Sequence, residues 1–211
     1  MEAGRDLIER VTRRVLLSLE GDPRLVVAGV SNRHVHLCPR HVEALFGPGH
    51  RLERMKDLRQ PGQYACRETL LAATAGGVLE GVRVLGPERE RSQFELSLSD
   101  ARRLRISPPL AKSGAEGACP SVTLVGPSGS VVLDSGVALA WRHVHLSPEE
   151  GASLGLKDGD EIDVEAGSDR GVLFRRVWVR VHRAFVGEFH VDVDEANACG
   201  LTTGEVVRLC V

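Results

Sequence analysis

One pentapeptide, Arg-His-Val-His-Leu, occurs twice in this sequence of 211 residues, at positions 33–37 and 142–146. In both copies a small residue, a proline and a short helical pattern follow, and an apolar run precedes. Five identical consecutive residues seldom recur by chance. The repeat predicts two related halves, each with a strand that ends at a shared site.

The two histidines of each copy are separated by one valine. Side chains at positions i and i+2 of a β-strand project from the same face. His34 and His36 can therefore point together, and so can His143 and His145. Neutral imidazoles are common zinc ligands, so the spacing predicts metal binding. A single His-x-His pair is often only two surface histidines on an edge strand, but two copies favour a metal site.

Each histidine pair leaves a tetrahedral ion two ligands short. Glu95 in SQFELS and His190 in EFHVDVD lie in strand-like runs and are candidate third ligands. Three protein ligands with a fourth, open position are typical of catalytic zinc.

Short strands and turns dominate the remaining pattern. The 23 glycines and 10 prolines separate valine-rich runs. The expected strands cover residues 25–30, 78–85, 92–98, 122–125, 130–133, 161–165, 172–181, 188–193 and 206–209. Short helices are expected to begin near residues 38, 99, 147 and 194, where a capping residue precedes helix formers. The fold class is therefore mainly β, with barrels or sandwiches capped by short α-helices.

Composition excludes several classes of protein. Hydrophobic residues make up 42% and charged residues 27% of the chain, as in a soluble globular protein. A net charge of −2 gives no electrostatic case for a nucleic-acid partner. No apolar run approaches the roughly 20 residues that cross a bilayer. The five cysteines are scattered and odd in number, so we expect a reducing cytoplasm rather than a disulfide framework.

Residues 5–19 have the spacing of an amphipathic helix, which Gly21 and Pro23 end. Such a helix could dock on the protein's own surface, or it could be a tag that binds a partner or a protein shell.

Several motifs in order resemble one known family. VSNRHVHL, QPGQYACRETL, VRVLGPER, FELSLSD, WRHVHLSP and HVDVDEANA are similar to motifs of the PduL-like phosphate propanoyltransferases of propanediol utilisation. The likeness runs from about residue 25 to the C-terminus. One departure is Cys38, where the family usually has serine or threonine.

The resemblance implies two six-stranded β-barrel domains capped by short α-helices, with the first strand completing the C-terminal barrel. The expected division is an N-terminal helix or tag at 1–22, a first barrel from 23–32 plus 141–211, and a second barrel at 33–140.

The resemblance also implies two zinc ions per chain, close to one another at the barrel interface. One would be held by His34, His36 and Glu95, and the other by His143, His145 and His190. Arg89 matches the family's arginine that holds phosphate. We expect Ser31 and Asn32 to contact coenzyme A, which is a substrate.

The implied reaction interconverts a short-chain acyl-CoA (propanoyl-CoA or acetyl-CoA) plus phosphate and an acyl phosphate plus CoA, by direct transfer. Two alternatives remain open: a zinc-dependent hydrolase of a thioester or amide, and a metal-stabilised shell or scaffold module.

The expected partners are small molecules and a second copy of the chain, with no nucleic acid and no membrane. Residues 1–20 could address the enzyme to the shell or core proteins of a bacterial microcompartment within the cytoplasm.

Overall fold

The protein divides into two compact units. The computed structural model describes residues 21–112, 119–167 and 169–211. The terminal unit contains residues 21–30 and 142–211, and the central unit contains residues 31–141. The amphipathic helix expected over residues 5–19 lies outside the described residues. No described helix is long and apolar enough to cross a membrane.

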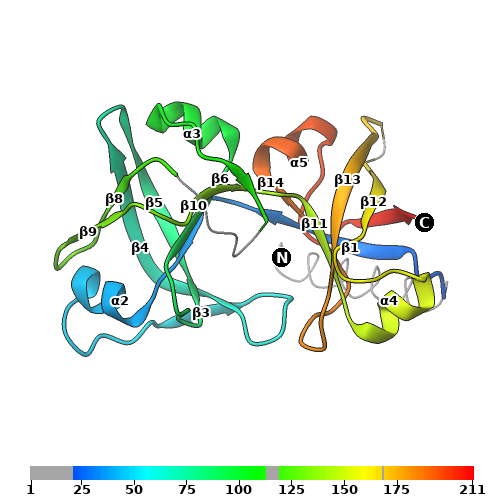
Figure 1. Ribbon diagram of the computed structural model, residues 1–211, viewed down its shortest axis with the longest axis horizontal. Helices are drawn as coiled ribbons and strands as arrows, with labels where there is room; N and C mark the ends of the chain where they lie inside the picture. Colours follow the sequence, from blue (N-terminus) through cyan, green and yellow to red (C-terminus); the bar gives the residue numbers. More distant parts are fainter. Residues whose placement is uncertain (1–20, 113–118, 168) are drawn as a thin grey trace, which may run out of the picture. The chain divides into compact units, whose positions relative to one another are not determined.

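The terminal unit is a closed barrel of six strands in the order β1-β14-β11-β13-β12-β15. Its strands are β1 (Leu25–Ser31), β11 (His143–Leu146), β12 (Glu161–Ala166), β13 (Val172–Val181), β14 (Glu188–Asp192) and β15 (Val206–Cys210). Its helices are α4 (Pro148–Leu154) and α5 (Val193–Cys199). In Figure 1 the blue β1 lies among the yellow to red strands of the C-terminal segment. The prediction that the first strand completes the C-terminal barrel is confirmed.

The central unit is one curled sheet of nine described strands. They are β2 (His34–His36), β3 (Arg54–Asp57), β4 (Tyr64–Thr74), β5 (Gly77–Gly86), β6 (Gln93–Leu96), β7 (Leu110–Ala111), β8 (Val122–Val125), β9 (Ser130–Leu133) and β10 (Val137–Ala140). Its helices are α2 (Pro39–Phe46) and α3 (Leu98–Leu104). The order is β7-β10-β6-β2-β5-β4-β8-β9, with β3 paired to β4. The mainly β prediction is confirmed, but this sheet is an open half-barrel rather than a closed barrel of six strands.

The two units repeat one strand arrangement. In the central unit, β2 pairs antiparallel with β6 and parallel with β5. In the terminal unit, β11 pairs antiparallel with β14 and parallel with β13. In the terminal unit β1 lies next to both β14 and β15 and closes the barrel. The equivalent strands of the central unit, β6 and β8, have two different neighbours, β10 and β9. The central sheet therefore stays open because no single strand joins its two ends.

Each unit has its own apolar core, and the repeated pentapeptide contributes to both. The valine and leucine of the first copy, Val35 and Leu37, are fully buried in the core of the central unit. Val144 and Leu146 are fully buried in the core of the terminal unit. Since side chains alternate along a strand, burial of these residues turns the intervening histidines to the opposite face.

The longest strand of the central unit, β4, was not expected from the sequence. Its pairing with β5 shifts register between Ala65 and Thr69 and again between Leu70 and Ala72. Such irregularities interrupt the apolar-polar alternation that identifies a strand.

The four described helices begin at the expected places, but one of them lacks a side-chain cap. The hydroxyl of Ser147 accepts a hydrogen bond from the Glu150 amide at the start of α4, and Ser97 and Asp192 cap α3 and α5 in the same way. Cys38 occupies this position before α2 and makes no side-chain cap. In α2 the His41 amide donates instead to the backbone carbonyl oxygen of Cys38, at 2.9 Å.

Replacing Cys38 by serine should therefore stabilise the protein. A serine oxygen at this position can accept from the His41 amide in addition to the backbone carbonyl that now accepts it, and such a side-chain cap contributes about 1 kcal/mol. For a chain of this size the thermal midpoint should rise by about 2–4 °C, measured by circular dichroism. Cys210→Ser, at an exposed position, is the control and should leave the midpoint unchanged. An equal or lower midpoint for Cys38→Ser would show that the helix start gains nothing from a cap.

Candidate metal centres

The first cluster consists of His34 and His36 on β2 and Glu95 on β6. His34 is directly opposite Glu95 in the antiparallel pairing of these strands. One potential ligand atom from each residue lies within 4.8 Å of the others. Nε2 of His34 is 3.5 Å from Oε2 of Glu95. Both histidines are buried, so the cluster is largely shielded from water.

The backbone just before β2 fixes the tautomer of His34. Nδ1 of His34 is 2.8 Å from the carbonyl oxygen of Asn32, and the Ser31 hydroxyl lies 3.3 Å from the same nitrogen. A carbonyl oxygen only accepts hydrogen bonds, so Nδ1 carries the proton. The lone pair of His34 is then on Nε2, which faces Glu95. This arrangement suits a metal ligand, whose second nitrogen usually donates to a fixed acceptor.

His36 has a ring nitrogen with no hydrogen-bond partner among the described residues. Its Nδ1 is buried and makes no hydrogen bond. Burial lowers the pKa of His36 to about 2, and the charges of His34 and Arg89 act in the same direction. The ring is therefore neutral at physiological pH. A neutral, buried imidazole with an unused lone pair fits a metal ligand.

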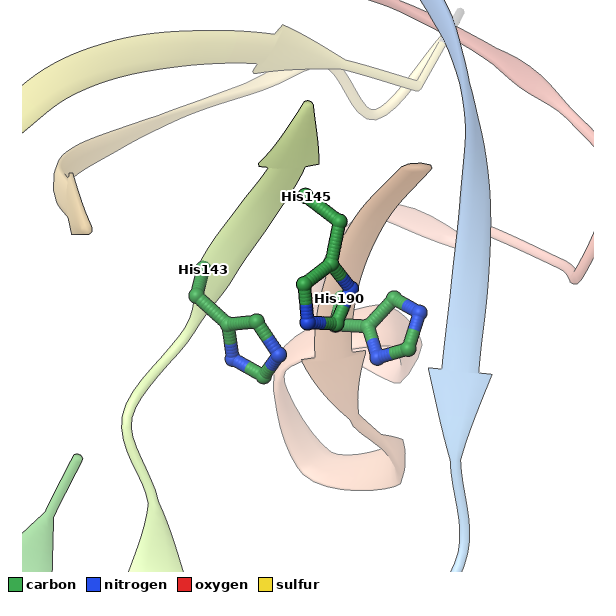
Figure 2. A group of neighbouring side chains, drawn as sticks. All are labelled: His143, His145 and His190. Atoms are coloured by element: carbon green, nitrogen blue, oxygen red, sulfur yellow. The ribbon is translucent and has the colours of Figure 1, made fainter. Parts of the chain in front are cut away.

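The second cluster consists of His143 and His145 on β11 and His190 on β14. His143 is opposite His190 in the antiparallel pairing, as His34 is opposite Glu95. The ring centroids of the three histidines are 4.7 to 5.0 Å apart, and Figure 2 shows the rings gathered beside one another from the two strands. Burial lowers the pKa of His145, and the other two rings lower it further. Nδ1 of His145 is also buried without a hydrogen bond.

A buried carboxylate and a glycine lie against His190. Oε2 of Glu188, which is only 5% exposed, is 2.8 Å from Nε2 of His190. On β1, a Cβ atom at Gly29 would come within 2.7 Å of the Glu188 carboxylate and 3.1 Å of the His190 ring. Only glycine leaves room for both groups at this point of the barrel.

An arginine lies beside His145 of the second cluster. Nη1 of Arg180 is 3.3 Å from Nε2 of His145. The guanidinium also lies over the rings of Trp178 and Phe185, at 5.1 Å from each centroid. These cation–π contacts hold a positive charge beside the three imidazoles.

The arginines of the repeated pentapeptide have equivalent roles in the two units. Arg33 pairs with Asp100 at 3.0 Å, and Arg142 pairs with Glu195. Asp100 is the third residue of α3, which follows the strand of Glu95. Glu195 is the third residue of α5, which follows the strand of His190. The ion pair therefore ties the start of the His-x-His strand to that helix in both units. Each of the five repeated residues thus does the same in both units: the arginine forms an ion pair, the two histidines belong to a cluster, and the valine and leucine pack in the core.

Both clusters have the composition of a zinc site. The first offers two nitrogens and one oxygen, and the second offers three nitrogens. Buried imidazoles that stay neutral keep their lone pairs available for a cation.

Comparison with known proteins assigns the chain to a family. The family model of phosphate propanoyltransferase matches residues 27–202. The chain belongs to the phosphate propanoyltransferase family. A phosphate propanoyltransferase of Rhodopseudomonas palustris is 46% identical over 224 residues, which cover 100% of this chain and 99% of the relative. One from Thermotoga maritima is 46% identical, with 97% of each chain covered, and one from Salmonella typhimurium is 43% identical, with 93% of this chain and 92% of the relative covered.

This membership makes the protein an acyltransferase and confirms the resemblance seen in the sequence. The structure brings together all six residues expected to hold zinc, as two separate groups of three. Arg89 lies in the loop between β5 and β6, close enough for its charge to affect His36. Ser31 and Asn32 lie beside His34, where the Asn32 backbone orients the ring.

Three residues around the second cluster were not expected to have these positions: Gly29, Glu188 and Arg180. Glu188 could have been found from the spacing, since it is two residues before His190 on one strand and therefore shares its face. The positions of Gly29 and Arg180 depend on strand neighbours that lie far apart in the sequence.

Proposed function

We propose that the protein interconverts a short-chain acyl-CoA plus phosphate and an acyl phosphate plus CoA, with two zinc ions per chain. The family supports the type of reaction. The observation that carries the proposal is the pair of three-residue clusters, which occupy equivalent positions in two units with the same strand arrangement. Propanoyl-CoA and acetyl-CoA differ by one methylene, which a pocket distinguishes by only about 1–3 kcal/mol. We therefore propose the short-chain class and not one donor.

His34, His36 and Glu95 would hold one ion, and His143, His145 and His190 the other. Bound zinc would supply a Lewis acid for the thioester carbonyl and a soft partner for thiolate sulfur. The Asn32 carbonyl would orient His34 through the hydrogen bond to its Nδ1. Glu188 would place a negative charge beside His190. Burial lowers the pKa of His36 and of His145 and so keeps these two imidazoles neutral. It would also limit access of bulk water to the reacting thioester.

Arg89 is the proposed phosphate-binding residue. Its Nη1 donates to Oε1 of Gln93 at 2.7 Å, and the side chain is half-buried next to the first cluster. A guanidinium has five N–H donors in a planar fork, so it can hold an oxyanion and the Gln93 side chain together. A phosphate held in this way would present an oxygen to the thioester carbon.

We propose direct transfer. A phosphate oxygen forms the new bond to the acyl carbon, the bond from carbon to sulfur breaks, and CoA leaves as thiolate and then takes a proton. Ser31 and Asn32 remain proposed contacts of coenzyme A, since both precede His34 and are not buried.

The setting of the enzyme is also a proposal. We expect a homo-oligomer in the cytoplasm, housed in a bacterial microcompartment if residues 1–20 act as a tag for shell or core proteins. The alternating charged and aliphatic residues of that segment support this role.

An assay of CoA release tests the reaction. Purified protein should release CoA from acetyl-, propanoyl- or butanoyl-CoA only when phosphate is present, with acyl phosphate as the second product. A chelator should abolish the activity, and added zinc should restore it. CoA release that does not require phosphate would show a hydrolase instead. No turnover, together with tightly held zinc that no ligand can reach, would favour a scaffold module.

The metal content of two variants tests the clusters separately. His36→Ala and His145→Ala should each lose about one zinc ion per chain in elemental analysis, because each removes one ligand of a three-ligand site. The double variant should lose both ions. His182→Ala, which removes an exposed histidine outside both clusters, is a control that should retain its zinc. Full metal content in both histidine variants would refute the site assignment.

Arg89→Ala should raise the KM for phosphate about tenfold and lower kcat by about 10²–10³, because an oxyanion loses a charged donor. Arg89→Lys should recover only part of the activity, since an ammonium group cannot form two parallel hydrogen bonds. The KM for acyl-CoA is the internal control. Unchanged phosphate kinetics would exclude Arg89 from phosphate binding.

A further inference from the structure

The loop between β5 and β6, residues 87–92, carries Arg89 and is attached to the chain just after His36. The Arg89 amide donates to the carbonyl oxygen of Leu37 at 2.9 Å. The Cys38 amide donates to the Ser92 hydroxyl oxygen, also at 2.9 Å. These two hydrogen bonds hold both sides of Arg89 against the segment that follows the first cluster.

The Ser92 hydroxyl makes a second hydrogen bond, to His41 on α2. Its oxygen is 2.8 Å from Nδ1 of His41, and the serine is only 8% exposed. The pKa of His41 is lowered by burial, so the ring is neutral and Nδ1 can accept. With Nδ1 as the acceptor, the Ser92 hydroxyl donates its proton to His41 while its oxygen accepts from the Cys38 amide. Both hydrogen bonds of this buried hydroxyl are structural, which argues against Ser92 as a nucleophile.

The equivalent helix in the terminal unit shows what Ser92 replaces. At the start of α4, the Ser147 amide donates to Oε2 of Glu150 at 2.7 Å, and the Glu150 amide donates to the Ser147 hydroxyl at 3.2 Å. This is a capping box within one helix. At the start of α2 the acceptor for the Cys38 amide is Ser92, which belongs to the loop of Arg89. The helix start and the arginine loop are therefore linked in the central unit.

We propose that Ser92 is a positioning residue, which fixes the Arg89 loop relative to His36 and so places the guanidinium for phosphate. This inference rests on the proposed function, in which Arg89 binds phosphate. Gln93 extends the same connection, because it follows Ser92, accepts from the Arg89 side chain and lies opposite His36 in the strand pairing. Loss of the hydroxyl frees one attachment of the loop while all six cluster residues remain.

Ser92→Ala tests this role in the zinc-loaded, full-length protein. The KM for phosphate should rise about tenfold, because a small displacement of a positioned group is costly. The KM for acyl-CoA and the zinc content should not change. Ser147→Ala is the matched control: it removes a cap from the equivalent helix and costs about 1 kcal/mol of stability, without raising the KM for phosphate. Ser92→Ala combined with Arg89→Ala should raise this KM no further than Arg89→Ala alone.

The outcomes separate the inference from the proposed function. If Arg89→Ala raises the KM for phosphate and Ser92→Ala does not, Ser92 has no positioning role and the role of Arg89 stands. If Arg89→Ala leaves this KM unchanged, the phosphate assignment itself fails. A large loss of kcat in Ser92→Ala at unchanged KM would overturn positioning in favour of direct chemistry. Should Ser92→Ala not fold, His41→Leu removes the same link, and an unchanged KM for phosphate would then overturn the inference.

Discussion

Strand register is the constraint on which both clusters depend. His34 meets Glu95, and His143 meets His190, only because each His-x-His strand pairs in one register with its antiparallel neighbour. A shift by one residue would turn the third cluster residue to the opposite face of the sheet. The register is held by the apolar face of the same strands, where the valine and leucine of the repeat are fully buried. One face of each short strand thus packs in the core, and the opposite face carries the cluster histidines.

The two units use a carboxylate differently within this shared frame. Glu95 is a member of the first cluster, whereas Glu188 lies two residues earlier on its strand and contacts His190. In the central unit the carboxylate, Glu95, lies opposite the first histidine of the pair, and Gln93 lies opposite the second. In the terminal unit the carboxylate, Glu188, lies opposite the second histidine, and His190 lies opposite the first. A divalent ion would therefore have a carboxylate among its own ligands in the first cluster, whereas in the second cluster three imidazoles would hold it and the nearest carboxylate, Glu188, would lie beside a ligand. Such a difference suits a reaction that handles a thiolate and an oxyanion.

The sequence predicted the histidine pairs directly, because the period of a strand places i and i+2 on one face. Glu95 and His190 were candidate third ligands because they lie in strand-like runs, but only the family resemblance assigned each of them to one histidine pair. Arg89 came from the resemblance alone, since distant strands must pair before these residues meet the histidines. The hydrogen bonds of Ser92 could not be predicted for the same reason: its partners, Cys38 and His41, are more than 50 residues away in the sequence. β4 was not predicted because its pairing is irregular. β10 was not predicted as a strand because its short apolar run was interpreted as the segment that precedes the second copy of the repeat.

The place of β1 has a consequence for biosynthesis. This strand leaves the ribosome early, yet its neighbours β14 and β15 are among the last segments to be made. At about 5–20 residues per second, the wait between them is roughly ten seconds or longer. During that time the central unit can fold while β1 exposes an unpaired, apolar edge that invites association with other nascent chains. Chaperone binding to the first 30 residues during translation would protect the chain over this interval.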